Sequence, residues 1–211
     1  RNGEMKLKKK NLLKSLAVAL SISLLAPFAN KVSAQETNIQ VPEIIGEAAV
    51  TMDINTGEII YSKNADLKLS PASTTKLMTA LLFAENKSKS DTLTFSDTVV
   101  KVTETSLNNY KAINPGDKIS AEDTMKSVMI FSANDTAYLM AESVGGTVDN
   151  FINMMNDKAA ELGLKNTHFV NPSGLEIDPL NPSNTEINQT TAYDLAQIGI
   201  AAFKNDWVRE T

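Results

Sequence analysis

Apolar and polar positions alternate in two short stretches near residue 50, the pattern of strands that bury one face. The first stretch covers residues 48–53 and the second covers residues 58–62. Between them, the segment Asn55-Thr56-Gly57 is rich in turn-forming residues. The pattern therefore predicts an antiparallel hairpin.

Beyond residue 70, apolar residues recur every three or four positions, which is the period of a helix. This period predicts helices at residues 73–86, 120–130, 135–144, 148–162 and 191–203. One short strand is predicted at residues 92–95. We therefore expect an α/β (α+β) fold, with one hairpin and a mostly helical body. A two-stranded hairpin is marginal alone and must pack on helices or further strands.

The first 34 residues have a different pattern. Met5 is followed by a lysine-rich segment, an apolar run at residues 16–26 and the small-residue end Val32-Ser33-Ala34. This order is typical of a secretory signal peptide, and it predicts cleavage after Ala34. The apolar run is short for a membrane span, which disfavours an uncleaved anchor. We expect residues 1–34 to be upstream residues and signal peptide, and residues 35–211 to form the domain.

The composition excludes several classes of site and partner. The 211 residues contain no cysteine and one histidine, which excludes disulfides and cysteine-based metal sites and argues against structural zinc. Without residues 1–34, the chain keeps 13 of its 20 basic and 24 of its 25 acidic residues, a net charge of −11. An acidic chain without a basic patch argues against nucleic-acid binding. The export signal and the lack of cysteine fit a bacterial extracytoplasmic protein.

The segment Ser73-Thr74-Thr75-Lys76 is the first candidate for chemistry. It follows a turn-forming Ser70-Pro71 and opens a run of good helix formers. Side chains three residues apart share a helix face, so Lys76 can approach the Ser73 hydroxyl. A partly buried lysine loses its proton readily and can activate a serine. The alternative is a capped helix with an exposed lysine.

The segment Ser132-Ala133-Asn134 is the second candidate, because it interrupts two helical runs. A short connection there can aim both polar side chains into a cleft. A hydroxyl can shuttle a proton, and an amide can bind a carbonyl and hold a lysine in place. The alternative is an ordinary helix N-cap, since Ser and Asn are both favoured there.

Together these segments resemble the penicillin-binding proteins and serine β-lactamases, which carry Ser-x-x-Lys, then Ser-x-Asn, then Lys-Thr-Gly. The closer resemblance is to the D-alanyl-D-alanine carboxypeptidases of the S11 peptidase family. It covers roughly residues 45–205, and besides the two motifs it rests on residues 50–60, 162–175 and 191–196.

The resemblance implies a penicillin-binding protein/β-lactamase transpeptidase-like fold and a role for each motif residue. Ser73 would attack the terminal D-Ala-D-Ala bond of a peptidoglycan stem peptide, and its N–H would form half of the oxyanion hole. Lys76 would take the serine proton. Ser132 would relay a proton to the leaving D-alanine, and Asn134 would orient Lys76 and bind the substrate amide.

The same resemblance implies the setting of the reaction. β-Lactam antibiotics would be acylating inhibitors, and no metal or organic cofactor would be needed. The protein would work outside the cytoplasmic membrane, on the cell-wall side, in cell-wall maturation and cell shape. After signal cleavage, nothing in the chain encodes membrane association.

The sequence departs from the family pattern after Asn134, where no Lys-Thr-Gly follows. In the family this motif lies on a sheet strand, binds the substrate carboxylate and supplies the other oxyanion N–H. We therefore expect the N-terminal portion of a carboxypeptidase, truncated before its C-terminal sheet strands. A non-catalytic peptidoglycan or β-lactam binding fragment is the alternative.

Two other enzyme classes fit less well. A class A β-lactamase carries a Glu-x-x-Leu-Asn loop, and Glu176, Asp178 and Glu186 do not match it. A Ser-His-Asp triad would need His168, the only histidine, which lies in a turn-rich segment without a G-x-S-x-G element. We interpret His168 as structural.

Overall fold

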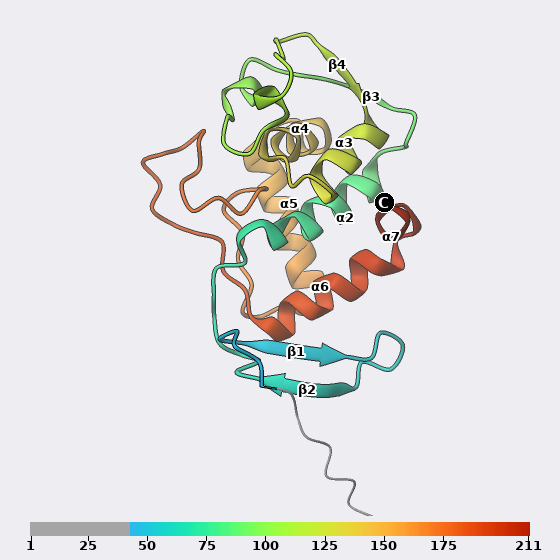
Figure 1. Ribbon diagram of the computed structural model, residues 1–211, viewed down its shortest axis with the longest axis vertical. Helices are drawn as coiled ribbons and strands as arrows, with labels where there is room; N and C mark the ends of the chain where they lie inside the picture. Colours follow the sequence, from blue (N-terminus) through green and yellow to red (C-terminus); the bar gives the residue numbers. More distant parts are fainter. Residues whose placement is uncertain (1–42) are drawn as a thin grey trace, which may run out of the picture. The chain divides into compact units, whose positions relative to one another are not determined.

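Helix α2 (Lys76–Asn86) lies in the middle of the part of the chain that the computed structural model describes, residues 43–211 (Figure 1). Its side chains are buried without a break from Met78 to Phe83. A helix that is buried on all sides belongs to the interior of a domain. The helix ends at Asn86 as predicted, but its α-helical part begins at Lys76, three residues after the predicted start, because residues 72–75 form a 3₁₀ turn. The predicted signal peptide lies outside the described residues.

Two apolar clusters form the core, and α2 contributes to both. Ala80 and Phe83 pack into the cluster formed with α3 (Ala121–Met129) and α4 (Asn134–Gly145). Met78 and Leu82 pack into the cluster formed with α5 (Val148–Glu161) and α6 (Ala192–Lys204). The central helix is therefore fixed by packing from both sides.

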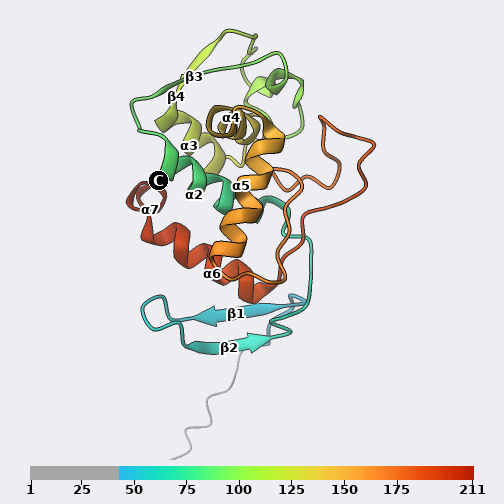
Figure 2. The same ribbon diagram turned by 180° about the vertical axis from the view of Figure 1, so that it is seen from behind.

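The predicted hairpin is confirmed as β1 (Ala49–Met52) paired antiparallel with β2 (Ile59–Lys63). Its turn is held by Asp53, whose Oδ1 accepts hydrogen bonds from the N–H groups of Asn55 and Thr56. Both ribbon views show β1 lying along α6, which gives the hairpin its cover (Figures 1 and 2).

A second two-stranded sheet was only half predicted. The expected strand at residues 92–95 is β3 (Thr92–Thr94), and it pairs antiparallel with β4 (Lys118–Ser120). The sequence analysis places no strand at residues 118–120, because three residues leave no room for an alternating pattern. Two 3₁₀ turns, η2 (Val99–Lys101) and η3 (Leu107–Asn109), lie between β3 and β4.

The other predicted helices are confirmed to within a few residues because local capping residues determine where they start. Ser120, Thr147 and Thr191 each accept a hydrogen bond from a backbone N–H in the first turn of α3, α5 and α6. Gly146, in a left-handed conformation, ends α4.

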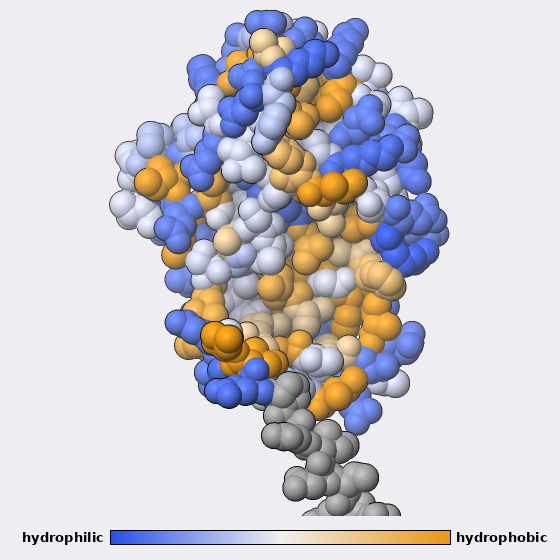
Figure 3. Space-filling model, viewed as in Figure 1, coloured by the Kyte–Doolittle hydropathy of each residue, from blue (hydrophilic) through white to orange (hydrophobic). Residues whose placement is uncertain are grey.

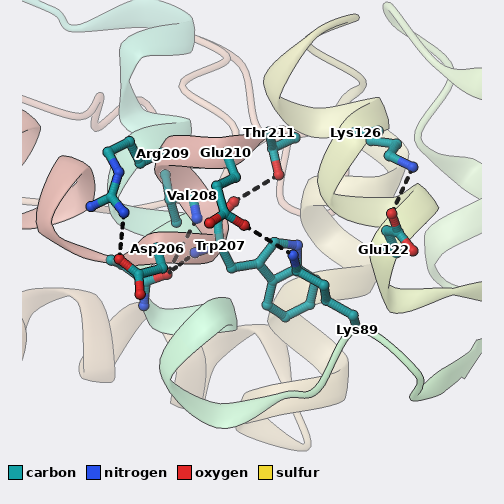
Figure 4. A network of polar contacts seen from close by, with 10 residues as sticks. Lys89, Glu122, Lys126, Asp206, Trp207, Val208, Arg209, Glu210 and Thr211 are labelled. Atoms are coloured by element: carbon teal, nitrogen blue, oxygen red, sulfur yellow. Dashed lines mark hydrogen bonds and ion pairs between the residues drawn. The ribbon is translucent and has the colours of Figure 1, made fainter.

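One short helix, α7 (Asp206–Glu210), was not predicted. The Asn205 Oδ1 atom caps it by accepting from the N–H groups of Trp207 and Val208. Polar contacts around it include ion pairs of Arg209 with Asp206 and of Lys89 with Glu210 (Figure 4). The buried Trp207 ring packs on Phe83 of α2, with ring centroids 5.6 Å apart.

Apolar side chains remain exposed on one face, over α6 and the hairpin (Figure 3). Phe203 of α6 and Ile60 of β2 are among the large exposed hydrophobic residues. None of the helices between residues 43 and 211 has the length and apolar character needed to cross a bilayer.

We expect Trp207→Ala to lower the free energy of unfolding by about 3 kcal/mol, the usual cost of removing a buried aromatic side chain. Trp207 is 8% exposed and belongs to the first core cluster. Phe203→Ala, at a site 52% exposed in the preceding helix, is the control and should cost well under half as much. Urea unfolding of both variants measures the difference, and equal losses would contradict the assigned packing.

Candidate active site

Ser73 lies in a 3₁₀ turn, η1 (Ala72–Thr75), that leads directly into α2. The predicted proximity of Ser73 and Lys76 is present: the Lys76 Nζ atom lies 3.1 Å from the Ser73 Oγ atom, within hydrogen-bond distance. Ala72, just before the serine, has a φ of +46°, which is uncommon for a residue with a side chain. The serine hydroxyl and the lysine amine therefore form a pair within one turn.

The Lys76 side chain is only 3% exposed. Its second hydrogen bond goes to the carbonyl oxygen of Ser173, at 2.8 Å. No ion pair among residues 43–211 includes it. Burial without a counter-charge lowers the pKa of Lys76 from 10.5 to about 8. The alternative of an exposed lysine behind a capped helix is wrong, since Lys76 is buried and the side chain of the N-cap residue Thr75 makes no capping hydrogen bond to the first turn of α2.

The Ser173 carbonyl belongs to a buried loop, residues 171–175, that packs against η1, the turn that contains Ser73. Asn171 Oδ1 accepts from the N–H groups of Ser173 and Gly174. The Thr79 hydroxyl of α2 donates a hydrogen bond to the Pro172 carbonyl oxygen, with the two oxygens 2.6 Å apart. These contacts fix the loop on the side of α2 that carries Lys76.

Asn188 connects the loop to η1 through its buried side chain. Its Nδ2 donates to Thr75 Oγ1 and to the Asn171 carbonyl, both at 3.0 Å. Its Oδ1 accepts from the N–H groups of Val170 and Asn171. The roles of Asn171, Ser173 and Asn188 are not predictable from any motif in the sequence. The turn signal of residues 171–174 was visible, but its position beside Lys76 depends on contacts about a hundred residues apart.

Gly174 lies where the loop closely approaches Ala72 of η1. Its φ is +86°, and a Cβ atom there would lie 1.8 Å from the Ala72 carbonyl oxygen. Only glycine can therefore stand at this position without moving one of the two segments.

Ser132 and Asn134 each border a hollow that Ser73 also borders. Ser132 (φ +62°) borders a hollow with Ser73 and Lys76, and Asn134, the first residue of α4, borders a second hollow with Ser73. The N-cap of α4 is Ala133, with no side-chain hydrogen bond, so the capping alternative is wrong. All four predicted site residues therefore border one or both of the two hollows that Ser73 lines.

The Asn134 side chain makes a different contact from the one expected. Its Nδ2 donates to the Glu104 carbonyl at 2.7 Å, and the hydrogen bonds of Lys76 go to Ser73 and Ser173. Its Oδ1 atom is buried and has no hydrogen-bond partner among the described residues.

The segment that contains Glu104 is fixed to the start of α4. The Asn134 N–H donates to the Thr105 carbonyl at 2.8 Å. The buried Asp135 carboxylate accepts from the Ser106 hydroxyl and from the Leu107 N–H. This segment therefore forms a fixed wall of the second hollow, a cavity of about 430 Å³.

The model of the D-alanyl-D-alanine carboxypeptidase family, peptidase S11, matches residues 35–210. The chain belongs to this family. Among curated S11 relatives it is similar to the D-alanyl-D-alanine carboxypeptidase DacF of Bacillus subtilis, at 34% identity over 194 residues, which cover 89% of this chain and 46% of the relative. The chain thus spans about half the length of the curated relatives it matches.

Solved structures support the fold of an S11 peptidase. The D-alanyl-D-alanine carboxypeptidase DacD of Francisella tularensis matches with a TM-score of 0.69 and 31% identity, over 85% of this chain and 43% of that one. Penicillin binding protein 6B of Escherichia coli matches with a TM-score of 0.68 and 28% identity, over 81% of this chain and 54% of that one. The predicted α+β, penicillin-binding protein type of fold is confirmed.

The residues considered for other enzyme classes lie as follows in this S11 chain. His168 is exposed and pairs through its backbone with Gln189. Asp178 Oδ1 accepts a hydrogen bond from the hydroxyl of the buried Tyr138, with the two oxygens 2.7 Å apart. Glu186 is exposed. Glu176 borders the second hollow together with Ser73.

We expect Gly174→Ala to slow acylation of Ser73 at least a hundredfold, because the added Cβ forces the loop and its Ser173 carbonyl away from Lys76. Gly116→Ala is the matched control: Gly116 also has a positive φ (+93°), but an added Cβ there meets no atom within 4 Å. In both variants the alanine must adopt a positive φ, which destabilises the folded state by on the order of 1 kcal/mol.

The measurement is the rate of labelling by a serine-directed acylating reagent, with circular dichroism to confirm folding. Equal rates in the two variants would show that the close approach at Gly174 does not support the site.

Proposed function

We propose that the protein containing this chain is a serine-type D-Ala-D-Ala carboxypeptidase acting on peptidoglycan stem peptides. The observation that carries the proposal is the buried Lys76 amine, which has no carboxylate partner among the described residues and lies beside the Ser73 hydroxyl in a chain of the S11 family. A serine needs a base to become a nucleophile, and an amine with a pKa of about 8 can serve near neutral pH.

In the first step, the neutral Lys76 amine takes the Ser73 hydroxyl proton while the Ser73 oxygen attacks the carbonyl carbon of the D-Ala-D-Ala bond. The carbonyl becomes a tetrahedral oxyanion, and the Ser73 N–H supplies part of the oxyanion hole. The Ser173 carbonyl accepts a hydrogen bond from Lys76 and so keeps the amine directed at Ser73.

In the second step, the C–N bond breaks and the leaving D-alanine nitrogen receives a proton by way of Ser132. Ser132 is suited to this relay because it borders the same hollow as Ser73 and Lys76. The remaining peptide is an ester of Ser73, and water hydrolyses it. Asn134 binds the substrate amide, since its buried Oδ1 lacks a partner.

The setting follows from the same proposal. Residues 1–34 direct export, and residues 35–211 act on the cell-wall side of the bacterial cytoplasmic membrane. β-Lactams, which mimic the D-Ala-D-Ala end, acylate the same serine.

We expect benzylpenicillin to form a covalent adduct on Ser73 of the whole protein, and Ser73→Ala to abolish both the adduct and D-alanine release. Intact-mass spectrometry with peptide mapping identifies the site, and Ser70→Ala, three residues upstream, is the control. An adduct on Ser132 would contradict the assignment. An adduct on Ser73 without any D-alanine release would favour the alternative of a non-catalytic binding protein.

We expect the second-order rate of acylation to rise with pH and to level off above about pH 8. Below that value Lys76 is protonated and cannot accept the serine proton, so the rate falls about tenfold per pH unit. Lys76→Arg should remove acylation, because a guanidinium stays protonated. A flat profile from pH 6 to 9, or an active arginine variant, would show that Lys76 is not the base.

A further inference from the structure

Two carboxylate residues border the hollow that contains Ser73 and Asn134. Glu104 lies in the segment before η3, and Glu176 lies two residues after Gly174. The described residues that border this hollow include no lysine or arginine. The ion pairs among residues 43–211 include neither glutamate. The hollow therefore carries two negative charges without a matching positive one.

Both carboxylates extend from fixed backbone. The Asn134 side chain and N–H hold the carbonyls of Glu104 and Thr105. On the other wall, Asn171 Nδ2 donates to the Leu175 carbonyl at 2.8 Å, directly before Glu176. The same contacts that build the Ser73 site therefore hold the two glutamates.

A separate observation indicates that this hollow receives a ligand. Asn134 is 3% exposed, and its Oδ1 has no hydrogen-bond partner within residues 43–211. A buried acceptor without a donor is costly, so it requires an explanation. An N–H donor of a bound peptide would satisfy it beside the nucleophile.

We propose that Glu104 and Glu176 form a subsite for an ammonium-bearing side chain on the residue that precedes D-Ala-D-Ala. The inference rests on the proposed function and names its substrate class, a stem peptide with a free side-chain amine. An ammonium placed there is attracted by two carboxylates. A neutral side chain gains no such attraction, and an acidic side chain is repelled.

Charge also sets the direction of the bound peptide. The leaving D-alanine ends in a carboxylate, which two glutamates repel. The hollow on the other side of Ser73 is bordered by Lys76, Ser132 and apolar residues, with no acidic residue. The carboxylate end therefore lies on the Ser132 side, and the amino-side residues lie between Glu104 and Glu176.

The test compares two peptides with the whole protein: Nα-acetyl-L-Lys-D-Ala-D-Ala, with a free ε-amine, and its Nα,Nε-diacetyl form. An exposed ion pair contributes a factor of up to about five. We expect the free amine to raise kcat/KM about tenfold at low salt, and this preference to shrink as salt screens the charges.

Glu104→Gln and Glu176→Gln should each lower the preference about threefold, and the double variant should abolish it. Hydrolysis of the diacetyl peptide should stay unchanged in all three. Glu58→Gln, in the hairpin, removes the same charge away from the hollow and should keep the full preference.

The outcomes separate this inference from the proposed function. Equal rates for the two peptides in the unmodified protein, or a preference that survives in the double variant, would overturn the subsite while leaving the carboxypeptidase assignment intact. No Ser73-dependent hydrolysis of either peptide would overturn both.

Discussion

The site depends on a lysine amine that is buried without a negative partner. The Lys76 ammonium would lose its water and gain only the Ser73 hydroxyl and the Ser173 carbonyl, so burial in the folded state makes the charged form less favourable than it is in water and lowers the pKa. The unfolded chain keeps a pKa near 10.5, and the folded chain has one near 8. The unfolded state therefore binds more protons between these values, and stability rises as the pH increases from about 8 to 10.5. Below pH 8 the full cost applies, on the order of 3 kcal/mol.

Hydrogen bonds between neutral polar groups around Lys76 stabilise the fold and offset this desolvation cost. Asn171, Thr79 and Asn188 satisfy the backbone of the loop, and Gly174 lets it approach η1. Four residues other than glycine in the described range have a positive φ, and three of them, Ala72, Thr105 and Ser132, border the hollows at Ser73. Strained backbone persists only where the surroundings hold it. In this domain, most of the non-glycine residues with a positive φ therefore lie at the hollows that Ser73 borders.

The features that could be predicted from the sequence are those that depend on neighbouring residues, such as helix caps and residue spacing. Ser120 and Thr191 fix helix starts, and the three-residue spacing of Ser73 and Lys76 fixes their proximity. β4 and α7 were missed because segments of three and five residues carry too little periodicity. The partner of Lys76 was also missed. A backbone carbonyl has no residue signature, and the position of Ser173 depends on contacts that no local pattern encodes.

The separation along the chain between the two halves of the site has a consequence for folding. Lys76 meets Ser173 across 97 residues, and Asn188 meets Thr75 across 113. Contacts of such high sequence separation form late, because the chain between them must first be ordered. Until the loop reaches α2, Lys76 remains hydrated and protonated, and Ser73 stays an ordinary alcohol. The pairing of Ser73 with a buried Lys76 amine thus arises only in the last stage of folding, once the loop has packed on α2.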